Sequence, residues 1–101
     1  MSYFSMKFRP MFERPLLEGI KTCTSRTKRM GEPGDRFVAF GAEFEVLSVE
    51  EKRLWEVRSL WKEEGCASAE QFEQIWTSIH PRTGYLPYQI VKLHTFKRVQ
   101  P

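Results

Sequence analysis

Alternating apolar and polar side chains predict most of the strands of this chain. Alternation of this kind marks segments in which every second side chain faces a core. It predicts strands at residues 21–28, 36–40, 42–53 and 88–98. In the third of these the alternation changes phase near Leu47, which indicates a bulge. The opening segment 6–12 also alternates and predicts a half-buried strand that is limited by Pro10.

The first of the four strands concentrates polar side chains on both of its faces. Strict alternation places Thr22, Thr24 and Arg26 on one face and turns Cys23 and Ser25 to the other. A regular strand would therefore separate Thr24 from Ser25. We expect Thr24 and Arg26 to face a common ligand.

Apolar residues at helical spacing predict three helices. They span residues 14–19, 54–64 and 69–80, and the third is capped by Ser68. The first helix should direct its apolar side chains inward, namely Leu16, Leu17 and Ile20. The apolar stripes of the other two carry all the tryptophans, which we expect in the core: Trp55, Trp61 and Trp76.

Strands and helices in this order favour the α+β class. The first predicted strand and the last, over 88–98, should belong to one curved antiparallel or mixed sheet, or a small barrel, with the helices packed outside it. A chain of 101 residues, of which 41% are hydrophobic, makes a single domain over residues 1–101. No second core fits this length.

Composition narrows the function classes. Apolar stretches are far shorter than a membrane helix needs, and the N-terminus lacks a signal-peptide pattern, so we expect a cytoplasmic protein. Two cysteines without a CxxC pair argue against a disulfide framework and a zinc ribbon. Neither histidine is accompanied by other metal-type residues, and both are expected to be structural.

Charge is distributed unevenly along the chain. Residues 1–41 carry eight Lys/Arg against four Asp/Glu, residues 42–80 carry four against nine, and residues 81–101 carry four against none. If the two basic ends meet in space, they form a positive face that suits a phosphate-bearing ligand such as a nucleotide or RNA. The alternative is a mixed, solvated surface.

The segment from Gly19 to Arg26 is the strongest candidate for chemistry. It brings an ammonium group, hydroxyls and a guanidinium together where a helix ends and a strand begins. Lys21 and Thr24 are three residues apart, so they meet only if Lys21 comes from the loop before the strand. A threonine becomes a nucleophile when a base such as a lysine takes its proton. The alternative is a set of solvated or phosphate-binding cations. Cys23 is interpreted as a buried structural cysteine.

These residues carry a resemblance to a known family. Gly19, Lys21 and Arg26 form the pattern GxKxxxxR, with Leu16-Leu17 before it and Gly34-Asp35 after it. This pattern is similar to the signature of ASCH domains. ASCH domains belong to the PUA-like superfamily, and the resemblance implies a small curved β-barrel or sheet with flanking helices. It also implies an association with RNA or modified nucleosides, and it covers nearly the whole chain.

Within that family, residues 21–26 most resemble the small bacterial N(4)-acetylcytidine amidohydrolases. The resemblance implies a Thr nucleophile at Thr24, a Lys base at Lys21 and a Glu proton relay at Glu64, with Glu63 as a competing position. It favours an amidohydrolase that removes an acyl group from the exocyclic amine of a modified cytosine nucleoside. Two alternatives remain, a non-catalytic RNA- or nucleotide-binding module and a metal-independent ribonuclease that uses the same cationic cleft.

Substrate binding is assigned to residues near these three and to one loop. Arg26 and Thr22 lie in the same segment, and Tyr85 and Tyr88 lie in a Pro/Gly-bounded loop, where exposed aromatic rings can stack on a base. We expect no cofactor and no metal. The expected partner is a modified nucleoside or RNA, not a membrane, and we expect a monomer.

Overall fold

The structure, a computed structural model, describes residues 2–100. It contains four strands, three α-helices and one 3-10 helix, η1. In chain order these are η1 (Pro10–Phe12), α1 (Glu13–Leu17), β1 (Cys23–Arg26), β2 (Arg36–Ala39), β3 (Ala42–Arg53), α2 (Leu54–Arg58), α3 (Ala69–Ile79) and β4 (Ile90–Arg98).

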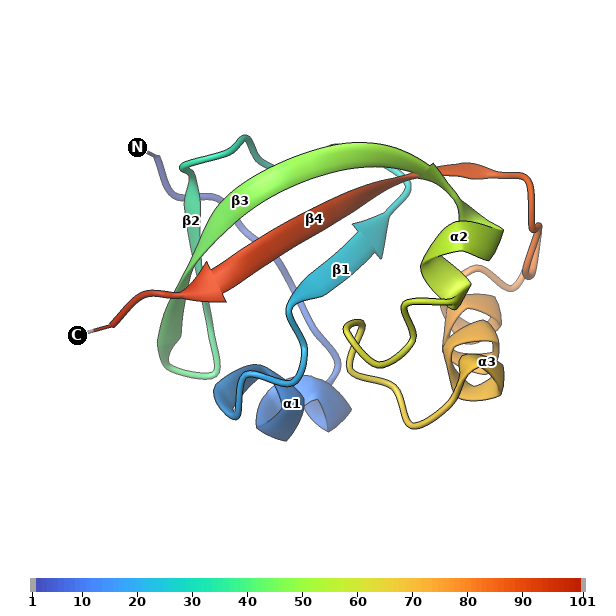
Figure 1. The fold of residues 1–101 in the computed structure, drawn as a ribbon, viewed down its shortest axis with the longest axis horizontal. Helices are drawn as coiled ribbons and strands as arrows, with labels where there is room; N and C mark the ends of the chain where they lie inside the picture. The colour runs from blue at the N-terminus through green and yellow to red at the C-terminus, as the bar shows by residue number, and fades with distance from the viewer. Residues whose placement is uncertain (1, 101) are drawn as a thin grey trace.

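The strands form one curled antiparallel sheet in the order β1-β4-β3-β2. Its long strands, β3 and β4, arch across the molecule, and the helices lie to one side of the arch (Figure 1). β1 is an edge strand and pairs only with β4, with Thr24 opposite His94. The predicted α+β class, and the placing of the first and last predicted strands in one sheet, are confirmed.

Turn and bulge signals were predicted well. Phe40 and Gly41 join β2 to β3 with φ values of 51° and 78°, as a tight hairpin turn requires. The register of β3 against β4 shifts between Val46 and Ser48, so the skipped Leu47 is the predicted bulge. Leu47 is exposed, which is the position an unpaired bulge residue can take without loss of core contacts.

An aromatic cluster forms the centre of the core. Phe37 lies 5.3 Å from both Phe44 and Phe96, measured between ring centroids, and these three rings come from three different strands. Phe8 completes the cluster from the N-terminal segment, 5.8 Å from Phe37. Edge-to-face and offset pairs of this kind stabilise a core beyond the area they bury. They also fix the N-terminal segment across the sheet.

The opening segment is not the strand that its alternation predicts. Met6 is buried and Lys7 is exposed, so the alternation of burial is present, but the segment is irregular and leads into η1. Main-chain pairing with the sheet lies before residues 6–12, where Tyr3 bridges Arg36 and the Phe4 amide donates to the Arg36 carbonyl. Beyond that point Phe8 packs by its side chain alone. The alternation in this segment therefore reflects alternating burial of its side chains, without the hydrogen-bond ladder of a paired strand.

The second helix is much shorter than predicted. α2 ends at Arg58, and the chain then follows turns to Gly65, whose φ is 88°. The Ser59 hydroxyl donates to the Glu56 carbonyl, and the Glu63 carbonyl accepts the amides of β1, so the chain leaves the helical path to reach the sheet edge. Trp55 and Ile20 are predicted to lie in the core, but both side chains are half-exposed.

The third helix matches its prediction. Ser68 caps it by accepting a hydrogen bond from the Gln71 amide at 3.0 Å, and Phe72 and Trp76 are buried on its inner face. At 11 residues it is the longest helix of the described chain. None of the helices within residues 2–100 has the length and hydropathy needed to cross a membrane.

His94 links the centre of the sheet to the loop that follows β1. The ring is fully buried; its Nε2 accepts the Met30 amide at 3.0 Å, which leaves Nδ1 to donate to the Lys92 carbonyl at 3.1 Å. This arrangement requires a neutral ring, and burial lowers the pKa of His94 from its ordinary value. His94 is therefore the structural histidine that the sequence predicts.

The neutral state of His94 should make the fold acid-sensitive. The unfolded chain takes up a proton on this ring below pH about 6.5, whereas the folded protein does so only at lower pH, so stability falls as the pH drops through that window. We expect the free energy of unfolding in urea to decrease by about 1 kcal/mol between pH 7.5 and 5.5 on this account. His94→Gln should abolish most of that slope. A slope that His94→Gln leaves intact, or that His80→Gln removes instead, contradicts the assignment.

Candidate functional site

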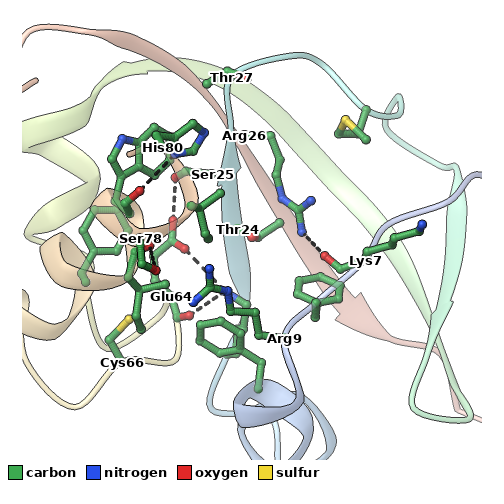
Figure 2. A pocket seen from close by; sticks show the side chains of 18 of the residues that line it. Lys7, Arg9, Thr24, Ser25, Arg26, Thr27, Glu64, Cys66, Ser78 and His80 are labelled. Atoms are coloured by element: carbon green, nitrogen blue, oxygen red, sulfur yellow. Dashed lines mark hydrogen bonds and ion pairs between the residues drawn. The ribbon is translucent and has the colours of Figure 1, made fainter. Parts of the chain in front are cut away.

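A cavity of about 630 Å³ lies between β1, the N-terminal segment and α3 (Figure 2). Polar and charged side chains contribute to it from all three, together with the turn that follows α2. Its polar lining is formed by Lys7, Arg9, Lys21, Thr24, Ser25, Arg26, Thr27, Lys28, Glu64, Ser78 and His80. The Lys21, Thr24, Arg26 and Glu64 side chains that the sequence predicts to converge do share this cavity.

Lys21 enters the site from the loop before β1, as the spacing to Thr24 demands. The amides of Ile20 and Lys21 both donate to the Pro15 carbonyl at 2.9 Å, which turns the chain inward at the end of α1. The side chain is 3% exposed. Its Nζ donates to the Glu64 carbonyl at 2.5 Å, to the Cys23 carbonyl at 2.9 Å and to Glu64 Oε1 at 3.4 Å.

Glu64, and not its neighbour Glu63, supplies the carboxylate of the site. Glu64 is 5% exposed, whereas Glu63 is exposed and contributes its main-chain carbonyl to the amides of Thr22 and Cys23. Both oxygens of the Glu64 carboxylate are held, Oε1 by Lys21 and Oε2 by the Ser25 hydroxyl at 2.6 Å. The carboxylate therefore has a fixed orientation toward β1.

The Lys21–Glu64 pair is costly to bury and well compensated. Removing two charges from water costs several kcal/mol each, and attraction between them offsets this only when further polar partners complete the geometry. Two carbonyls and the Ser25 hydroxyl are those partners here. The Phe12 ring adds a cation–π contact, with Nζ 4.6 Å from its centroid. Such a pair contributes little net stability. A buried charge pair that lines a cavity is therefore a candidate for a role in chemistry or binding.

Gly65 allows the Lys21 side chain to pack against the main chain. A Cβ at Gly65 would lie 3.0 Å from Lys21 Cβ and 3.1 Å from Lys21 Cδ, closer than a methyl group fits. Its φ of 88° also suits glycine. The step from Glu64 to Gly65 thus places a carboxylate and a close approach to Lys21 in adjacent residues.

Ser25 is a site residue that the sequence prediction does not name, although alternation places it on the correct face of β1. The sequence prediction turns Ser25 away from Thr24, yet both are buried and both line the cavity. β1 is an edge strand without a neighbour on one side, so the cavity reaches around it and takes side chains from both faces. Figure 2 shows Ser25 and Glu64 on one side of the strand and Arg26 on the other.

Thr24 lies in the cavity without a partner. None of the hydrogen bonds among residues 2–100 joins its hydroxyl to Lys21 or to any other group. The hydroxyl is therefore available to a ligand. Lys21, in contrast, directs its nitrogen to three oxygen acceptors, so a proton must leave it before it can accept one from Thr24.

The two thiols near this site are not suited to nucleophilic attack. Burial is the main cause that raises the pKa of Cys23 well above its ordinary value, and it raises the pKa of Cys66 to about 11. The charge of Glu64 acts in the same direction on both. Both residues are free cysteines, protonated at neutral pH. The interpretation of Cys23 as a structural residue is supported.

One wall of the cavity is aromatic. Trp76 stacks on His80 with ring centroids 4.2 Å apart, and Phe72 lies 6.2 Å from Trp76. All three come from α3 or its C-cap and line the cavity. Trp76 is 4% exposed and belongs to the core, as the sequence predicts. That Trp76 and His80 also line a cavity depends on how α3 packs against the rest of the fold, for which the chain carries no local signal.

The opposite wall is basic. Figure 2 shows Lys7 and Arg26 on the side of the cavity away from Ser78 and His80, while the Arg9 side chain extends toward Glu64. Arg26 Nη2 donates to the Lys7 carbonyl at 2.6 Å, and its guanidinium lies 5.2 Å from the centroid of the Phe8 ring. Desolvation lowers the pKa of Arg26 from its ordinary value, while Glu64 raises it.

Three predicted binding residues lie elsewhere. Thr22, Tyr85 and Tyr88 are absent from the lining of the cavity. Tyr85 packs against the core and Tyr88 is 75% exposed. The prediction that Tyr88 is exposed is correct. A sequence pattern that predicts an exposed loop does not, however, predict how far that loop lies from the cavity. Within residues 2–100 no group of three or more His, Cys, Asp or Glu side chains is placed to hold a metal ion.

Replacement of Gly65 should disturb the site more than its backbone conformation alone explains. Gly34 is the matched control, because its φ of 93° is similar and nothing lies within 4 Å of an added Cβ. We expect Gly34→Ala to cost about 1 kcal/mol of unfolding free energy from the left-handed conformation, and Gly65→Ala to cost about 1–3 kcal/mol more from the contact with Lys21. Urea unfolding of the two variants measures the difference. Equal losses would show that Gly65 does not pack on Lys21.

Comparison with known proteins identifies the fold. No protein-family model and no curated protein matches the sequence. Among solved structures, the ASCH domain from Lactobacillus crispatus JV V101 aligns with a TM-score of 0.76 and 13% identity, over 96% of this chain and 79% of that one.

Two further structures share this architecture. The hypothetical protein PH0355 aligns with a TM-score of 0.73 and 14% identity, over 98% of this chain and 100% of that one. Protein EF3133 from Enterococcus faecalis V583 aligns with a TM-score of 0.65 and 16% identity, over 97% and 78%. Structural similarity at sequence identities this low shows a shared fold and does not by itself show a shared function. The chain has the ASCH fold that residues 19–26 predict.

Proposed function

We propose that the protein is an amidohydrolase that removes an acyl group from the exocyclic amine of a modified cytosine nucleoside, of the N(4)-acetylcytidine kind. One observation carries the proposal: a buried, hydrogen-bonded Lys21–Glu64 pair lines a ligand-sized cavity that the unpartnered hydroxyl of Thr24 also lines. These are the residues that the resemblance to the acetylcytidine amidohydrolases assigns to the reaction.

The first step uses the hydrogen bond between the paired charges. Transfer of one proton from Lys21 Nζ to Glu64 Oε1, along the hydrogen bond between them, converts the ion pair into an amine and a carboxylic acid. The neutral amine then takes the proton of Thr24 Oγ1 as this oxygen attacks the acyl carbonyl carbon. An ammonium group forms at Lys21, and the carbonyl becomes a tetrahedral oxyanion.

The second step releases the nucleoside. Glu64 gives its proton to the exocyclic nitrogen as the C–N bond breaks, which yields the free amine, an acyl ester on Thr24 and the original Lys21–Glu64 pair. Water then hydrolyses the ester by the same groups. Ser25 has no proton to transfer in this scheme; its hydrogen bond to Oε2 holds the carboxylate in place at 2.6 Å.

The aromatic wall supports a nucleobase as the ligand. A cytosine ring is flat, and the His80 ring, which stacks on the buried Trp76, lines the cavity as a flat surface. Stacking of a base on an aromatic side chain contributes about 1–3 kcal/mol. The volume of about 630 Å³ lies within the range of small-ligand sites.

A second candidate is a non-catalytic nucleotide-binding module, and the basic wall favours it. In that case Lys21 and Arg26 act as fixed cations and no proton moves. The two functions differ in what they require of Lys21. A guanidinium replaces an ammonium as a positive charge but does not deprotonate in proteins, so it cannot serve as a base.

Incubation with N(4)-acetylcytidine tests the proposed activity. We expect the purified protein to release cytidine, detected by chromatography, at a rate proportional to protein concentration. Thr24→Ala protein, purified in the same way, controls for contaminating hydrolases. Absence of cytidine at high protein concentration, with binding of the compound still measurable, would leave the binding module as the function.

Substitution at Thr24 and Lys21 should give losses that do not add. We expect Thr24→Ala and Lys21→Ala each to lower kcat by several orders of magnitude, and the double variant to be about as impaired as either single one, because the residues act as one unit. Lys21→Arg should also be inactive, whereas Lys97→Arg on the exposed surface should be normal. Circular dichroism and urea unfolding establish that the variants fold. Retained turnover in Lys21→Arg contradicts the role of Lys21 as a base.

A further inference from the structure

We infer that the substrate carries a terminal phosphate, so that the cavity takes a cytosine nucleotide in preference to the free nucleoside. The inference rests on the proposed function for the identity of the base, and on the basic wall for the phosphate. The basic wall is defined as Lys7, Arg9, Arg26 and Lys28, which all line the cavity.

The cations of the basic wall have no acidic partners. Among the described residues, no carboxylate lies within 4.0 Å of any of the four. Some cations elsewhere are paired, as Arg36 is by Glu43 at 2.6 Å and Arg58 by Glu73 at 2.9 Å. Other exposed cations outside the cavity also lack a carboxylate within 4.0 Å, so it is the shared cavity that sets these four apart. Four unneutralised cations on one wall produce a local positive potential that an anion relieves.

The cavity offers no carboxylate to compete with an anionic ligand on that wall. Glu64 is the one acidic residue among the lining side chains of the described chain, and both of its oxygens are already engaged, by Lys21 and by Ser25. The charge of Glu64 is balanced within the site by Lys21. A ligand anion therefore meets the basic wall as an excess of four positive charges.

Arg26 is held in position to bind an anion. Its guanidinium is partly buried, fixed at one nitrogen by the Lys7 carbonyl and on one face by the Phe8 ring. The remaining N–H groups have no acceptor among the described residues. A guanidinium that is immobilised and partly desolvated loses little entropy on binding, and its planar fork matches phosphate oxygens in pairs.

The two walls match the two ends of a nucleotide. The aromatic wall, with Trp76 and His80, suits the flat base, and the basic wall on the other side suits a charged group. The buried Lys21–Glu64 pair lies in the same cavity, so a ligand can reach both walls and the reacting groups. A nucleoside without phosphate would leave the four cations without a counter-charge. A dianionic phosphate uses them better than a single carboxylate does.

Calorimetric titration with reaction products tests this directly. Cytidine 5′-monophosphate and cytidine differ only by the phosphate, and neither requires the protein to be catalytic. We expect the monophosphate to bind the wild-type protein at least about tenfold more tightly at 50 mM salt, with the advantage shrinking as salt rises. Equal affinities for the two compounds would overturn the inference.

A pair of double variants locates the effect on the basic wall. Arg9→Gln/Lys28→Gln removes two exposed cations that line the cavity, whereas Arg82→Gln/Lys97→Gln removes two exposed cations outside its lining and changes the net charge equally. We expect the first to lower affinity for the monophosphate at least about tenfold and leave cytidine unchanged, and the second to affect neither. Equal effects of the two would mean that net charge, not the basic wall, attracts the phosphate.

Two further ligands complete the test. Inorganic phosphate should compete with the monophosphate only weakly, because it lacks the base. A cytidylyl dinucleotide, whose phosphate is a diester, tells a terminal phosphate from an internal phosphate of RNA; we expect it to bind less tightly than the monophosphate. Tighter binding of the dinucleotide would overturn the assignment of a mononucleotide.

The outcomes for phosphate and for hydrolysis are independent. Suppose that the monophosphate binds preferentially but no acetylated substrate releases cytidine. This result would contradict the amidohydrolase activity and support the phosphate site. Hydrolysis of N(4)-acetylcytidine and its 5′-monophosphate with equal kcat/KM, unchanged in Arg9→Gln/Lys28→Gln, would keep the enzyme and sink the phosphate site.

Discussion

The burial of Lys21 against Glu64 is the constraint on which the rest of the site depends. Lys21 is 3% exposed, so each of the three N–H groups of its ammonium needs an oxygen acceptor within the protein. The acceptors are main-chain carbonyls as well as the carboxylate, so the chain must pass Lys21 closely and with fixed orientation. Gly65 permits that approach, and the Ser25 hydroxyl completes the carboxylate. Loss of any one of these hydrogen-bond partners removes part of the compensation for a buried charge.

The fold meets this constraint through its open sheet edge. β1 is paired only on its β4 side, and the turn after α2 uses the Glu63 carbonyl to accept the amides of Thr22 and Cys23 beside it. That contact brings Glu64 next to Lys21, 43 residues away in sequence. α2 ends at Arg58, and the turns that follow it carry Glu63 and Glu64 to the edge of β1.

The sequence predicts what is encoded locally. The bulge in β3, the turn at Gly41 and the Ser68 cap depend on neighbouring residues, and each was correctly placed. The end of α2 and the pairing of Ser25 with Glu64 depend on contacts across the fold, and neither was foreseen. Lys21, Thr24 and Glu64 were identified through a family resemblance, because their spacing alone fits solvated cations and hydroxyls equally well. No local sequence pattern indicates that α3 forms the aromatic wall of the cavity, because this depends on how the helix packs against the rest of the fold.

Charge along the chain acquires a physical meaning in the folded state. Several glutamates of the acidic middle segment pair with cations away from the cavity, such as Arg36, Arg58 and Lys92. The cations of the N-terminal segment and β1 are left without acids where they line the cavity. Interactions between exposed charges are weak individually, so this arrangement contributes little to stability. Its effect is to concentrate positive potential at the one place where an anionic ligand reaches the buried pair.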